Sequence, residues 1–157
     1  MKRKKSVDPF DEDSAQKSAI NLLKFRARSE FEMKSRLLEK GFDEGVIDRI
    51  IDKLKEFKML DDELFAYFYA YDKLTLNKKG PYIIKMELSR KFHIEENIIY
   101  AAIDKVLKEI NLKEIIRDII LSQLKLKKDK RKIKEYLYKR GFDMYLVEEV
   151  LNEVGGE

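Results

Sequence analysis

The chain has 157 residues, enough for one domain or for a short array of about three small units. It contains no cysteine, which excludes disulfides and thiolate metal sites. No apolar run approaches the roughly 20 residues of a membrane span, so the protein is expected to be cytoplasmic. Charged residues make up 41% of the chain, but its net charge of +4 is too small to indicate nucleic-acid binding by itself.

The first 13 residues are predicted to form a disordered charged tail. Four basic residues, Lys2 to Lys5, are followed by four acidic residues between Asp8 and Asp13. Such a segment has little apolar surface to bury on folding.

The first three-helix repeat is predicted over residues 14–60. The spacing Ser29-x-x-Glu32 is typical of a capping box, which opens the second helix of the repeat. Gly41 suits the left-handed position that ends this helix. Asp43 can then cap the third helix, whose apolar residues recur at helical spacing.

The second repeat is predicted over residues 61–111. Asp61 can cap its first helix, with Leu60 and Phe65 packing together as a hydrophobic staple. Pro81 fits the first position of the next helix, where its missing N–H group removes no hydrogen bond. A third helix closes the repeat.

The third repeat is predicted over residues 112–157, with helices over 112–126, 130–139 and 144–154. In each repeat, an apolar residue is followed four positions later by apolar pairs spaced three apart. These patterns begin at Phe42, Ile94 and Phe142, about 50 residues apart. The sequence therefore predicts an all-α fold of three tandem three-helix repeats that form an elongated, curved helical array. Such arrays present long surfaces suited to a polymer or a protein partner.

The strongest charge feature lies in the third repeat. Between residues 125 and 140, nine basic residues face only Asp129 and Glu135, a local balance of +7. This stretch predicts a basic face for an acidic protein surface or for DNA phosphates, although a solvated helix pair would also explain it. The candidate partner-binding residues are Lys125, Lys127, Lys128, Lys130, Arg131, Lys132, Lys134 and Arg140.

Other polar residues are better explained by structure than by chemistry. Asp61 and Asp62 are neighbours at a helix start, where capping accounts for them. His93 is the only histidine and has no ligand motif beside it. Tyr67 and Tyr69 lie on an aromatic-rich helix, which favours packing over stacking on bases. No catalytic residue, cofactor or metal site is predicted.

Two further basic groups have alternative explanations. Arg26 and Arg28 can contact a partner, or they can satisfy carbonyl groups at the end of the first helix. Lys78-Lys79-Gly80-Pro81 can bind an anion at a helix N-terminus, but it lacks the pattern of a nucleotide-binding loop.

Several of these elements together resemble the RecX regulatory proteins. The resemblance rests on the run from Ala19 through Arg28-Ser29-Glu30 to Lys40-Gly41-Phe42, on Leu60-Asp61-Asp62, on Lys79-Gly80-Pro81 and on Arg140-Gly141-Phe142. It covers residues 14–151 in the right order. The chain differs at Phe57-Lys58-Met59, where the family usually has a Gly-Tyr pair before Leu-Asp-Asp, and at Phe92-His93-Ile94, where the family usually has Lys-Gly-Ile.

The resemblance implies a non-enzymatic regulator that binds the RecA recombinase filament. Such a protein inhibits ATP hydrolysis and strand exchange and so modulates homologous recombination and DNA repair. The resemblance does not decide between capping a filament end and binding along its groove. A helical DNA-binding module that acts without RecA, on single- or double-stranded DNA, is the alternative. The chain is expected to act as a monomer.

Overall fold

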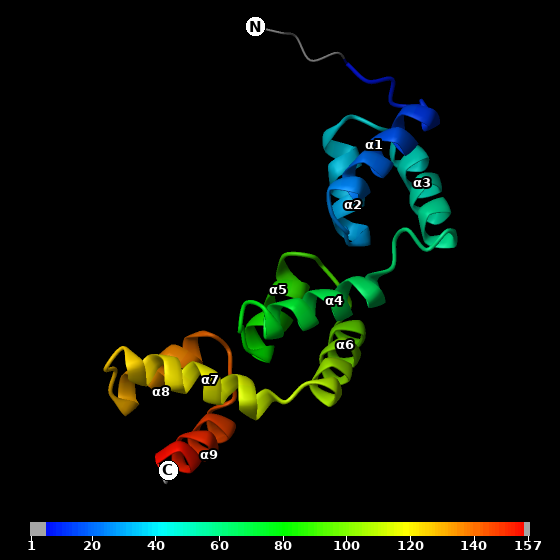
Figure 1. The fold of residues 1–157 in the computed structure, drawn as a ribbon. Helices are drawn as coiled ribbons and strands as arrows, with labels where there is room; N and C mark the ends of the chain where they lie inside the picture. Colours follow the sequence, from blue (N-terminus) through cyan, green and yellow to red (C-terminus); the bar gives the residue numbers. More distant parts are fainter. Residues whose placement is uncertain (1–5, 156–157) are drawn as a thin grey trace, which may run out of the picture. The chain divides into compact units, whose positions relative to one another are not determined.

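The computed structural model of the chain describes residues 6–155 (Figure 1). Within this range the structure is all-α, as predicted, and contains no strand. Its nine helices are α1 (Glu12–Phe25), α2 (Glu30–Glu39), α3 (Glu44–Glu56), α4 (Asp62–Thr75), α5 (Pro81–Arg90), α6 (Glu96–Glu109), α7 (Leu112–Lys125), α8 (Lys130–Lys139) and α9 (Met144–Gly155).

Helical structure begins earlier than the predicted N-terminal tail implies. Helix α1 begins at Glu12, because the Asp11 side chain accepts a hydrogen bond from the Ser14 amide. Upstream of it, Val7 packs against the first core, and the Asp43 amide donates to the Pro9 carbonyl at 2.8 Å. The prediction of disorder is therefore wrong for this part of the tail. Its first five residues lie outside the described range.

The predicted start and stop signals of the helices are confirmed. Ser29 and Glu32 form both hydrogen bonds of the capping box at the start of α2. Gly41 has φ +97°, the left-handed conformation predicted after that helix. The Asp43 carboxylate caps α3, and Pro81 occupies the first position of α5.

Each of two helix triplets encloses its own apolar cluster. Isolated helices of this length are marginal in water, so packing within the triplets supplies most of their stability. The first cluster joins α1, α2 and α3, and the second joins α7, α8 and α9. Their fully buried side chains include Met33, Leu37, Val46 and Ile47 in the first, and Ile116, Ile120, Ile133, Leu137 and Val147 in the second.

The chain divides into two compact units. The described part of the N-terminal unit comprises residues 6–65 together with Phe92–Ile94, and that of the C-terminal unit comprises Ala66–Lys91 together with residues 95–155. The division passes through α4 and the turn after α5. The division into three repeats at residues 60/61 and 111/112 stays a prediction.

Both departures from the family pattern fall at left-handed backbone positions. Lys58 has φ 57° and His93 has φ 51°, and glycine is the residue that adopts this conformation without strain. Two more lysines share it, Lys78 at φ 51° and Lys127 at φ 58°. A side chain at such a position costs about 1–2 kcal/mol.

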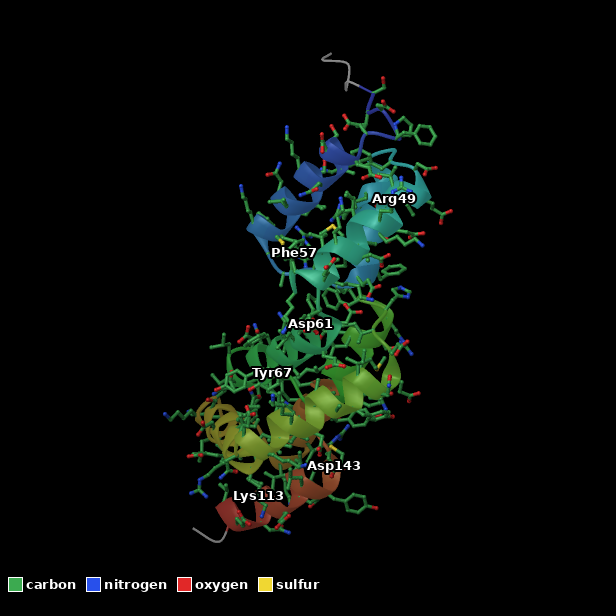
Figure 2. The ribbon with its side chains drawn as sticks, turned by 90° about the vertical axis from the view of Figure 1, so that its right-hand side faces the viewer. Arg49, Phe57, Asp61, Tyr67, Lys113 and Asp143 are labelled. Carbon is green, nitrogen blue, oxygen red and sulfur yellow. The ribbon has the colours of Figure 1, made fainter. Side chains whose placement is uncertain are left out.

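We expect Lys58→Gly to stabilise the N-terminal unit. Relief of the left-handed strain exceeds the extra entropy that glycine loses on folding, leaving a net gain of about 1 kcal/mol. Lys58 is exposed and follows the end of α3 at Phe57 (labelled in Figure 2), so its side chain supports no core packing. Urea unfolding followed by circular dichroism would measure the gain. A lower midpoint for the variant would contradict the assigned conformation.

Candidate partner-binding surface

The basic stretch of the third triplet lies on the last residue of α7, the turn that follows it and the length of α8. Lys125 ends α7, and Lys127 and Lys128 lie in the turn. The Asp129 side chain accepts from the Lys132 amide at 2.9 Å and so caps α8. The structure therefore brings most of the predicted basic residues together on one turn and one helix start.

Helix α8 begins with three cations at the positive end of its own dipole. Lys130, Arg131 and Lys132 form its first turn, which contains no acidic residue. A positively charged side chain at a helix N-terminus, the positive end of the dipole, typically costs about 0.3–1 kcal/mol. By contrast, the first turns of α1, α2, α3, α4, α6 and α7 all carry acidic residues. The charge of this turn therefore opposes the stability of α8, and its role in partner binding stays a prediction.

The predicted basic residues differ in how far they are neutralised. Lys134 is half-buried and pairs with Glu148, whose pKa is lowered chiefly by that hydrogen bond. Arg131 is 88% exposed at its side chain and forms only a weak pair with Glu135, one helical turn away. Five lysines are exposed and have no ion pair among residues 6–155: Lys125, Lys127, Lys128, Lys130 and Lys132.

Arg140 is placed apart from these exposed lysines. Its Nε donates to the Lys78 carbonyl at 2.9 Å, and a second guanidinium nitrogen donates to the Asn77 carbonyl. Arg140 therefore ties the end of α8 to the turn before α5, within the C-terminal unit. Its guanidinium is thus held in place by the protein itself, and the role of Arg140 in partner binding stays a prediction.

Main-chain bonds cross the same junction. The Gly80 amide donates to the Arg140 carbonyl at 2.6 Å, and the Tyr82 amide donates to the Gly141 carbonyl at 3.1 Å. Protein carbonyls thus occupy the N-terminus of α5. The backbone amides that the suggested anion site at Lys78-Lys79-Gly80-Pro81 would use are therefore occupied by the chain, and Lys79 pairs with Glu87 at 2.8 Å.

The arginines after α1 serve the N-terminal unit. Arg28 is buried, and its Nε lies 3.4 Å from the Leu22 carbonyl near the end of α1. Arg26 forms two hydrogen bonds to the Glu32 carboxylate, one of 3.0 Å. Burial acts to raise the pKa of Glu32, but hydrogen bonds from Arg26 and from the Ser29 amide outweigh it and lower that pKa. These contacts favour the structural explanation for both arginines.

The Glu32 contacts make an acid-sensitive contribution to stability. A carboxylate whose pKa is lowered in the folded state stabilises the protein fully at pH values above its ordinary pKa of 4.5. This stabilisation is lost as the pH falls through the lowered pKa of the folded state. We expect Glu32→Gln to be less stable than the parent at pH 7 and to lose less stability between pH 5 and pH 3. Urea unfolding across this range would measure the difference. Parallel curves for the two proteins would contradict the expectation.

Asp61 and Asp62 each cap a different helix. The Asp61 carboxylate accepts from the Leu64 amide at 3.2 Å at the start of α4, as predicted. Asp62 accepts from the Glu30 amide at 2.9 Å, so it caps α2 across 32 residues. Partial burial raises the pKa of Asp62. Each carboxylate therefore has a backbone partner, as the capping explanation requires.

Two tyrosines of α4 donate hydrogen bonds to carboxylates. Tyr67 (labelled in Figure 2) donates to Glu109, and Tyr69 donates to Glu87. Burial and the Glu87 contact raise the pKa of Tyr69 far above its ordinary value. Carboxylates beside both hydroxyl groups would repel nucleic-acid phosphates, which favours the packing explanation.

His93 stacks on Phe31 with 3.8 Å between the ring centroids, at the start of α2. Within residues 6–155, no group of three or more His, Asp or Glu side chains is placed to hold a metal ion. None of the described helices is both long and apolar enough to cross a bilayer.

Comparison with known proteins identifies the family. The family model of the first three-helix domain of RecX matches residues 15–54. Regulatory protein RecX of Thermotoga sp. (strain RQ2) is 40% identical over 139 residues, which cover 88% of this chain and 83% of the relative. The same-named protein of Geobacillus sp. (strain WCH70) is 34% identical over 138 residues, covering 85% and 51%.

A solved structure shares the fold. The crystal structure of RecX from Lactobacillus salivarius matches with a TM-score of 0.79 at 24% identity, covering 94% of this chain and 98% of that one. The sequence relatives are named regulatory proteins, in agreement with a regulatory role. The chain belongs to the RecX family of regulatory proteins.

Proposed function

We propose that this protein is a non-enzymatic regulator that binds the RecA recombinase filament and inhibits its ATP hydrolysis and strand exchange. The observation that carries the proposal is the set of exposed, unpaired lysines around the start of α8, of which Lys130 and Lys132 lie in a first turn where a cation opposes the helix dipole. Such a surface attracts an acidic partner over long range and speeds its association. Family membership supports the regulatory role.

The mechanism we propose is multivalent binding to neighbouring filament protomers. Helical triplets in series can each make a modest contact, and linked contacts hold far more tightly than any one of them. A regulator bound to two protomers would resist the relative motion that accompanies ATP turnover. A regulator bound at a filament end would instead block growth.

RecA ATP hydrolysis in the presence of single-stranded DNA tests the proposal. Increasing amounts of this protein should lower the rate. Inhibition well below one regulator per RecA protomer would support capping or long-range clamping, and inhibition near equal amounts would support binding along the groove. An unchanged rate, with folded protein shown by circular dichroism, would contradict the proposed function.

Direct binding to DNA is the second candidate, because the same lysines could contact phosphates. It predicts an affinity that falls steeply with salt, by about 0.9 logarithmic units per tenfold salt increase for each phosphate contacted on duplex DNA. Fluorescence anisotropy with labelled single- and double-stranded oligonucleotides, without RecA, would measure this dependence. Strong binding without inhibition of RecA would favour the second candidate.

A further inference from the structure

A small cationic cavity lies within the C-terminal unit, where the turn between α4 and α5 meets α7 and α8. Its volume is about 190 Å³. Two cations line it and no acidic residue does. The lining residues that matter here are Leu76, Asn77, Lys78, Ser122, Gln123 and Arg140.

The two cations reach the cavity in different ways. The Arg140 guanidinium is held by the Lys78 and Asn77 carbonyls, but these bonds use only two of its five donors. Lys78 is half-buried and forms no ion pair among residues 6–155. One fixed and one unpaired cation can together bind a carboxylate more strongly than an exposed lysine can.

Polar donors complete the lining. The side-chain amides of Asn77 and Gln123 form no hydrogen bond with other described residues, and Ser122 adds a hydroxyl group. Amide and hydroxyl groups can donate to the oxygens of an anion already held by the cations. The cavity is thus chemically suited to one anionic group.

Two exposed leucines, one in the cavity lining and one just after α7, point to the kind of partner. Leu76 lines it and is 76% exposed. Leu126, the C-cap of α7, is 64% exposed, and its amide donates to the carbonyl of the lining residue Ser122 at 3.3 Å. Exposed apolar side chains beside a polar pocket are typical of protein-binding surfaces, whereas nucleic acid is bound mainly by basic and aromatic groups.

We propose that this cavity binds a carboxylate side chain of a protein partner, on a segment whose apolar neighbours pack on Leu76 and Leu126. The proposal rests on the proposed function in expecting a protein partner, and adds a site that the basic stretch alone does not include. Lys78 would pair with the carboxylate, while Arg140 donates from a fixed position. The repeat register could have indicated Lys78, because Lys78 and Lys127 precede the starts of α5 and α8 by the same number of residues and share the left-handed conformation.

Lys78→Gly tests the site without straining the fold, and Lys58→Gly is its matched control. Both replace a lysine at positive φ, so neither is expected to lower stability. Lys58 belongs to the N-terminal unit and does not line the cavity. We expect Lys78→Gly to raise the concentration needed to half-inhibit RecA ATP hydrolysis about tenfold, and Lys58→Gly to leave it within about twofold of the parent.

A probe that does not involve RecA separates this proposal from the proposed function. The full chain, labelled with ¹⁵N, would be titrated with the peptide acetyl-Leu-Glu-Leu-Asp-Leu-amide and with its Gln/Asn counterpart. We expect the acidic peptide alone to shift the side-chain amide signals of Asn77 and Gln123, and we expect Lys78→Gly to abolish the shift.

The outcomes are distinct. Shifts by the acidic peptide with no inhibition of RecA would uphold the cavity and overturn the proposed function. Normal inhibition by Lys78→Gly with no peptide shift would overturn the cavity and leave the proposed function standing. Shifts by a thymidine oligonucleotide but by neither peptide would identify a phosphate site and also overturn the proposal.

Discussion

Gly80→Ala should destabilise the C-terminal unit by about 3–4 kcal/mol. A methyl group on Gly80 would lie 2.2 Å from the carbonyl carbon of Gly141 and 2.5 Å from the Phe142 nitrogen. Backbone atoms cannot rotate away as a flexible side chain can, so the turn before α5 and the turn after α8 must move apart. Overpacking typically costs 1–3 kcal/mol, and each main-chain hydrogen bond lost across the junction adds about 1 kcal/mol.

Two glycines in corresponding turns provide the controls. Gly141 has φ +89°, and a methyl group there would lie 2.6 Å from the Ile83 nitrogen, so Gly141→Ala combines strain with overlap. Gly41 has φ +97° but no atom within 4 Å, so Gly41→Ala isolates the strain, about 1–2 kcal/mol. Urea unfolding of the three variants would measure the loss of stability caused by the strain and by the steric overlap. If Gly80→Ala is no more destabilising than Gly41→Ala, the close approach of Gly80 and Gly141 is wrong.

The sequence predicted the features that depend on neighbouring residues. The capping box at Ser29, the cap at Asp43 and the helix start at Pro81 all act within four positions along the chain, so spacing alone reveals them. Helix periodicity likewise predicted the apolar clusters, because it records which face of a helix is buried.

Features that join distant residues could not be predicted in the same way. Asp62 caps α2 and Arg140 binds carbonyls before α5, but no pattern pairs residues 32 or 62 positions apart. Arg140 therefore looked like one more cation of the basic stretch. The cavity escaped prediction for the same reason, since three separate segments form it.

Reversing three charges at the start of α8 should separate binding from stability. Lys128, Lys130 and Lys132 are exposed and lack ion pairs within the described chain. Changing all three to Glu places acidic groups at the positive end of the helix dipole, which should preserve or raise stability by about 1 kcal/mol. Inhibition of RecA should nevertheless weaken at least tenfold, because an acidic surface would then meet acidic groups.

A control with the same change in charge removes the effect of net charge. Lys17, Lys24 and Lys53 are exposed residues of the N-terminal unit without an ion pair within residues 6–155, and replacing them with Glu changes the total charge equally. We expect this variant to inhibit RecA within about threefold of the parent at 0.15 M salt, where charges further apart than about 8 Å are screened. If both variants inhibit RecA as strongly as the parent does, a role for the α8 lysines is contradicted. Equal loss in both would assign the effect to net charge alone. Only selective loss in the α8 variant, with its stability retained, supports the view that α8 holds these cations against its dipole to bind an acidic partner.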